Sequence, residues 1–205
     1  MARSFRTQQP EAAARRRLRR EPDGSIELPR VVWRRPRNGD RHPLSAAVIR
    51  KVLQRDVPIE YLNGLARIEL RPRSADVGQP YAWYLPDERT ILLYSLPLEW
   101  TWEGRPSQSS MESMLRFYAD LTETPTGLHV SWPAPEVQSL WFFVEVLAHE
   151  LGHHHQRQYR IRRGSDRARR HEEFVAGLHS EKFYQAFVSR RIAAARQKAQ
   201  PSSQQ

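Results

Sequence analysis

Apolar residues recur at helical spacing in four segments of the chain. Residues 42–56 begin with Pro43 and Ser45, which favour a helix start, and their apolar residues then fall on one face at Val48, Ile49, Val52 and Leu53. Residues 109–121 open with a capping box, Ser109 and Glu112, ahead of an apolar stripe. The pattern predicts helices over residues 42–56, 109–121, 135–159 and about 168–199.

Four other segments show the alternation or turn signals of strands. Residues 65–72 alternate charged and apolar side chains, and residues 127–132 form a short apolar segment ended by Pro133. Residues 80–86 and 89–97 flank the turn signal Pro86-Asp87, which predicts a β-hairpin. The order of elements predicts an α+β domain in which a small sheet packs on a layer of helices.

The helix predicted over residues 135–159 carries the sequence His149-Glu150-Leu151-Gly152-His153. Residues four apart lie one turn apart on the same helical face, so both imidazoles can reach one ion. Glu150 lies beside that pair, where a carboxylate can hold and deprotonate a water molecule. Gly152 keeps the helix surface small next to this group. The motif therefore predicts a metal site with a general base.

The composition limits the ligands that a metal ion could have, the number of domains and the expected location of the protein. The chain has 205 residues, which suits one domain with tails: a basic disordered tail over residues 1–41, a domain over 42–197 and a short tail over 198–205. It has no cysteine, so a zinc ion would need histidine and carboxylate ligands. We expect Zn²⁺ as the cofactor. The sequence shows neither a membrane-length apolar run nor a secretory signal, and a cytoplasmic location is expected.

The positive charge is concentrated in two places. The net charge is +10, and residues 1–41 hold 12 arginines against 5 acidic residues. The loop 157–170 is also rich in arginine. Such runs are either solvated or in contact with nucleic acid or another acidic partner. Nucleic acid is therefore a candidate partner, beside a peptide or protein substrate.

The third metal ligand has several candidates downstream of the motif. A metzincin site is excluded, because Gln156 and Tyr159 stand where that class needs glycine and histidine. The HELGH helix followed by "EFVA" from Glu173 resembles the gluzincin metallopeptidases, including the ImmA/IrrE-type peptidases. The resemblance covers about residues 140–185. It implies a zincin-like fold and Glu173 as third ligand. Gly177 replaces the acidic or amide residue that often follows the alanine in that family.

A second resemblance points to another ligand. The segment "HSEKFYQAF" is similar to part of the SprT-like proteases, which would make His179 the third ligand and proteins on DNA the substrates. Glu172 also remains open. A rival from another class is a nucleic-acid-associated protein whose zincin-like domain is structural or degenerate.

The predicted activity is zinc-dependent peptide hydrolysis, with His149, His153 and Glu173 as ligands and Glu150 as general base. The resemblance to zincins also implies an edge strand that pairs with the extended substrate, and Arg89–Ser95 is the candidate. His154 and His155 are expected to be solvated or to support the ligands from outside. Candidate donors to the developing oxyanion are Tyr159, His171 and Tyr184.

Overall fold

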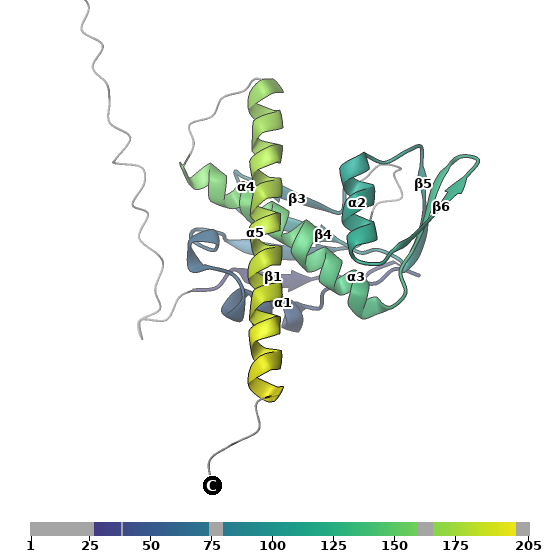
Figure 1. Cartoon of the computed structure of the whole chain (residues 1–205). Coiled ribbons are helices and arrows are strands. Elements are labelled where there is room, and N and C mark those ends of the chain that lie inside the picture. Colours follow the sequence, from purple (N-terminus) through teal and green to yellow (C-terminus); the bar gives the residue numbers. More distant parts are fainter. Residues whose placement is uncertain (1–26, 38, 74–79, 160–165, 200–205) are drawn as a thin grey trace, which may run out of the picture.

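The computed structural model describes residues 27–37, 39–73, 80–159 and 166–199 (Figure 1). It contains one four-stranded sheet, one three-stranded sheet and a layer of helices, which agrees with the predicted α+β class. Residues 1–26, which hold most of the predicted basic tail, lie outside the described residues, as do residues 200–205. No helix within the described ranges has the length and apolar character needed to cross a membrane.

The larger sheet is mixed and carries much of the core. Its spatial order is β1 (Arg30–Trp33), β2 (Arg67–Arg71), β4 (Thr90–Tyr94) and β3 (Ala82–Leu85). β1, β2 and β4 are parallel, while β3 returns antiparallel to β4 as the predicted hairpin. The inner face of the two central strands is fully buried at Ile68, Leu70, Ile91 and Leu93. Because β1 pairs with β2, the folded part includes Arg30 and does not begin at residue 42.

The prediction of the edge strand was wrong. β4, which lies within Arg89–Ser95, has neighbours on both sides and cannot pair with a further chain. β3 is the strand at that edge of the sheet. The hairpin itself was predicted, but its sequence does not reveal which arm pairs with β2.

The smaller sheet and the helix beside it differ from the prediction. The sheet has the antiparallel order β5 (Glu99–Glu103), β7 (Gly127–Ser131) and β6 (Asp120–Thr124). Of these strands only β7 was predicted. Helix α2 (Gln108–Arg116) is capped by Ser107, not by Ser109, and ends before Tyr118, whose φ of 61° is left-handed. This backbone turn frees residues 120–124 to form β6.

The other helices pack on the sheets and on one another. Helix α1 (Ala46–Arg55) has the predicted cap at Ser45 and buries Ile49 and Leu53, and the short helix η2 (Ile59–Tyr61) follows it. The predicted long helix is a continuous run made of α3 (Pro135–Trp141), the π-helical segment η3 (Phe142–Leu147) and α4 (Ala148–Tyr159). The last helix, α5 (Asp166–Ala199), crosses this run (Figure 1).

Helix α5 approaches α4 most closely at Gly152. A Cβ atom placed there would lie 3.0 Å from the Cβ of His179 and 3.2 Å from the Cα of Ala176. Both contacts are tighter than side chains normally make, and one of them involves backbone. The absence of a side chain at Gly152 is therefore a condition for the observed helix crossing.

Two glycine substitutions should have opposite effects on stability. Gly152→Ala should lower the free energy of unfolding by about 1–3 kcal/mol, because the added methyl group forces α5 away from α4. Gly177→Ala, in the exposed interior of α5, meets nothing within 4 Å and should raise it by about 0.5–1 kcal/mol through helix propensity. Urea unfolding followed by circular dichroism measures both. An unchanged or more stable Gly152→Ala protein would contradict the packing argument.

Candidate metal centre

Three potential ligand side chains converge where α4 meets α5. The Nε2 atoms of His149 and His153 lie 3.1 Å apart. One carboxylate oxygen of Glu173 is 3.2 Å from His149 Nε2, and the other is 3.4 Å from His153 Nε2. The two histidines come from successive turns of α4, and Glu173 comes from α5. These three residues form a group that could hold a metal ion.

The distances within this group suit a small tetrahedral ion. Zinc binds histidine nitrogen and carboxylate oxygen at about 2.0–2.1 Å, so the atoms around a tetrahedral zinc lie about 3.3 Å apart. The Nε2 atoms of the two histidines, 3.1 Å apart, are close to that value, and each has one of the two Glu173 carboxylate oxygens within 3.4 Å. Two nitrogens and one carboxylate also match the ligand set that a chain without cysteine can offer to zinc.

Without a metal, the charges of this group are coupled. Burial lowers the pKa of His149, but the hydrogen bond to Glu173 and the neighbouring carboxylates outweigh it, so the pKa lies above its usual value. Burial and the charge of His149 together lower the pKa of His153. The hydrogen bond with His149 lowers the pKa of Glu173. Glu173 therefore favours the ionised form, as a metal ligand requires.

Glu150 lies beside the group but is not part of it. Its side chain is buried, and burial raises its pKa to about 7, although His149 and a hydrogen bond from the backbone N–H of Tyr84 act in the opposite direction. A carboxyl group of this kind exchanges a proton near neutral pH, as a general base needs.

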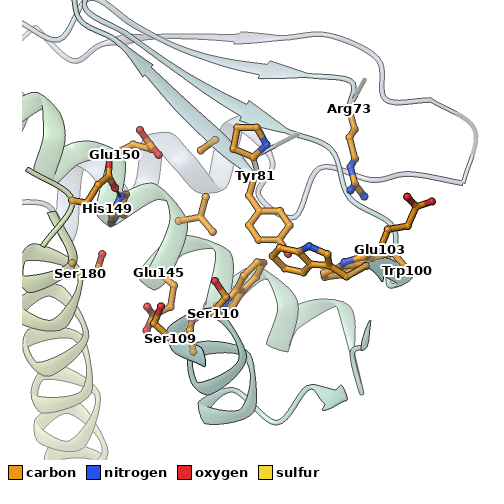
Figure 2. Close-up of a pocket in the computed structure, with 18 of the residues that line it drawn as sticks. Arg73, Tyr81, Trp100, Glu103, Ser109, Ser110, Glu145, His149, Glu150 and Ser180 are labelled. Carbon is orange, nitrogen blue, oxygen red and sulfur yellow. Dashed lines mark hydrogen bonds and ion pairs between the residues drawn. The ribbon is translucent and has the colours of Figure 1, made fainter. Parts of the chain in front are cut away.

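A wide cleft opens in front of these residues. It has a volume of about 1090 Å³, and His149, Glu150 and Glu173 line it. Figure 2 shows His149 and Glu150 at one end, Tyr81 and Trp100 further along, and Glu145 with Ser109 and Ser110 on another wall. The serines belong to α2, so the smaller sheet and its helix supply much of the cleft that the sequence did not reveal.

Glu145 is a cleft residue that the sequence analysis missed. It lies in the π-helical segment before the motif, and burial raises its pKa despite the nearby Arg116. Arg116 contacts both Glu145, at 3.4 Å, and Glu181, at 2.8 Å, and so connects α2 to both long helical elements. An acidic residue inside an apolar helix segment was the available signal.

His154 is buried and not solvated, contrary to one of the two alternatives left open for it. Its ring nitrogens lie 2.9 Å from the Tyr84 hydroxyl and 3.0 Å from the backbone oxygen of Asn63, and burial lowers its pKa to about 4. His154 therefore fixes α4 against β3 and the segment after η2. His155 instead stacks on Tyr61, with ring centroids 4.4 Å apart.

The other candidate ligands lie apart from the two histidines. His179 is buried against Gly152, and its Nδ1 hydrogen-bonds with the Tyr61 hydroxyl. Glu172 points to Arg157, 3.8 Å away. The structure thus brings Glu173 close to His149 and His153, and it brings neither His179 nor Glu172 there.

The candidate oxyanion donors gain no support from their positions. His171 is exposed on α5, and Tyr184 packs on Phe117 and Arg116, so neither lines the cleft. The side chain of Tyr159 lies outside the described residues, as do residues 160–165 of the arginine-rich loop.

Comparisons with models of known protein families, with curated proteins and with solved structures found no match for this chain.

Metal content should depend on the three grouped residues. Purified wild-type protein should hold about one zinc ion per chain, and His149→Ala and Glu173→Ala should lose most of it, because two remaining ligands form a weak, open site. Glu172→Ala and His179→Ala are matched controls from the same helix and should keep it. Elemental analysis of all five proteins is the measurement. If His179→Ala lost zinc while Glu173→Ala kept it, the third metal ligand would be His179 and not Glu173.

Proposed function

We propose that this protein is a zinc-dependent metallopeptidase that hydrolyses peptide bonds in the cleft beside His149 and Glu150. The observation that carries the proposal is the convergence of the His149, His153 and Glu173 side chains on one point, with a separate buried carboxylate next to them. A purely structural metal site needs no such carboxylate and no open cleft.

His149, His153 and Glu173 would hold the ion. When bound, zinc supplies Lewis acidity, which lowers the pKa of a water in its open position and polarises a carbonyl group. Glu150 would accept the proton of the attacking water and then donate it to the leaving amine. Burial keeps bulk water away from the Glu150 carboxylate, and the backbone N–H of Tyr84 holds its orientation.

The free edge of β3 offers a place for the peptide backbone. The backbone N–H of Tyr94 donates to the backbone oxygen of Tyr81, so these two residues form a hydrogen-bonded pair. Along the β3–β4 ladder, hydrogen-bonded and non-hydrogen-bonded pairs then alternate from this pair onward. By this alternation the backbone groups of Ala82 and Tyr84 face away from β4. The hydrogen bond from Tyr84 N–H to Glu150 agrees with that direction, and Ala82 lines the cleft. An extended peptide can therefore add to β3 next to the general base.

The proposal includes membership of this chain in a zincin-like family, of either the gluzincin or the SprT-like type. The position of Glu173 supports the gluzincin type. The order of the sheet, with antiparallel β3 at the edge above the motif helix, supports a zincin-like arrangement.

Replacing the proposed base should separate catalysis from folding. Glu150→Gln keeps the shape and hydrogen-bonding capacity of the side chain but cannot accept the proton of water. The protein should stay folded and zinc-loaded, with peptide hydrolysis lower by about 10²-fold or more. Zinc content, thermal unfolding and hydrolysis are measured on the same preparation.

The matched control is Glu136→Gln, the same substitution at an exposed position in the first turn of α3. It should leave hydrolysis unchanged. Equal activity of Glu150→Gln and wild type, with zinc bound, would remove Glu150 from the mechanism.

A further inference from the structure

Four aromatic side chains gather along one side of the cleft. We call Tyr81, Trp100, Trp102 and Trp141 the aromatic wall. The ring of Tyr81 lies 5.2 Å from that of Trp141, 5.8 Å from that of Trp102 and 6.1 Å from that of Trp100, each in an edge-on arrangement. All four residues line the same cleft as His149 and Glu150. Figure 2 shows Tyr81 and Trp100 there.

The opposite side of the cleft is also apolar. Phe174 and Leu178 lie one turn apart on α5 and line the cleft, yet they remain 63% and 46% exposed. Large apolar side chains with this much exposure, beside a cavity, indicate a surface that is covered when a ligand binds. The two sides together suit an occupant with its own apolar surface.

Charge does not select the occupant of the aromatic wall. Arg73 and Glu103 are both found at this end of the cleft, so one positive and one negative group offset each other (Figure 2). Neither a cationic nor an anionic side chain therefore gains a clear advantage there. Aromatic rings instead favour large apolar side chains, whose surface they remove from water.

The position of Tyr81, which immediately precedes β3, fixes which substrate residue the aromatic wall meets. Tyr84 lies at Glu150, and Tyr81 precedes it by three residues, which corresponds to about 10 Å along a strand. A peptide antiparallel to β3 runs from the Leu85 end toward the Tyr81 end. Its residues after the cleaved bond therefore approach the aromatic wall.

We propose that the aromatic wall is a specificity subsite, which selects a large apolar side chain about two or three residues to the carboxyl side of the cleaved bond. The assignment of that position rests on the proposed peptidase function. Trp102 is the residue to test, because it is only half-buried, whereas Trp100 and Trp141 belong to the core.

The first experiment maps cleavage. Full-length zinc-loaded protein is incubated with a mixture of random decapeptides, and the products are sequenced by mass spectrometry. Phe, Tyr, Trp, Leu and Met should be enriched about 10-fold over Ala, Lys and Glu at the second or third position after the cleaved bond, the usual scale for an apolar subsite. Trp102→Ala should lose this enrichment, and Trp102→Phe should keep most of it.

The matched control is Trp33→Ala. Trp33 is 55% exposed on β1, at the other edge of the sheet, and does not line the cleft. Its removal should leave the enrichment unchanged. Cleavage by wild type without apolar preference, or the same preference in Trp102→Ala, overturns the subsite and leaves the peptidase proposal intact.

The second experiment measures binding without cleavage. Zinc-loaded Glu150→Gln protein is titrated with two acetylated, amidated decapeptides of Gly, Ser and Ala that differ by one Phe in place of Ala. The Phe peptide should bind about 10-fold more tightly, and adding Trp102→Ala should abolish the difference. If this holds while wild type cleaves no peptide, the apolar subsite stands and the peptidase proposal falls. Equal binding of the two peptides overturns the subsite.

Discussion

The close contact between α4 and α5 at Gly152 is the constraint on which the candidate metal centre depends. Two of its residues, His149 and His153, are placed by one helix alone, because residues four apart share a face. Glu173 comes from a different helix, and its distance from them is set by how closely that helix approaches. A bulkier residue at position 152 would change the distance of Glu173 from the two histidines without contacting Glu173.

A second constraint holds the helix of the motif against the sheet. Tyr84 takes part twice: its hydroxyl meets His154, and its backbone N–H meets Glu150. The edge strand and the proposed general base are therefore positioned by the same residue. The buried polar groups around His154 are also costly to leave unpaired, so the helix has one favourable orientation against β3.

The parts of the site that sequence could predict are those encoded locally. The spacing of His149, Glu150 and His153 needs only a helix, and the apolar pattern of residues 135–159 indicates one. Glu173 required a resemblance, because its proximity arises from tertiary packing. The cleft was not predicted: the alternation of β5, with Trp100 and Trp102 between Pro97 and Gly104, is a strand signal that was overlooked, and its pairing with the distant β7 arises from tertiary structure. The burial of His154 was not predictable from sequence either, because it depends on which way the side chain faces and on where β3 lies.

The π-helical segment Phe142–Leu147 bears on how the two ends of the cleft are aligned. A π-helical turn accommodates one more residue than an α-helical turn, which rotates everything before it by about 100° relative to everything after it. Trp141, in the aromatic wall, stands before the segment, and His149 stands after it. The number of residues between Trp141 and His149 therefore sets the angle between their side chains. A single deletion between them could leave the identity of every cleft side chain intact and still turn the aromatic wall out of line with the histidines.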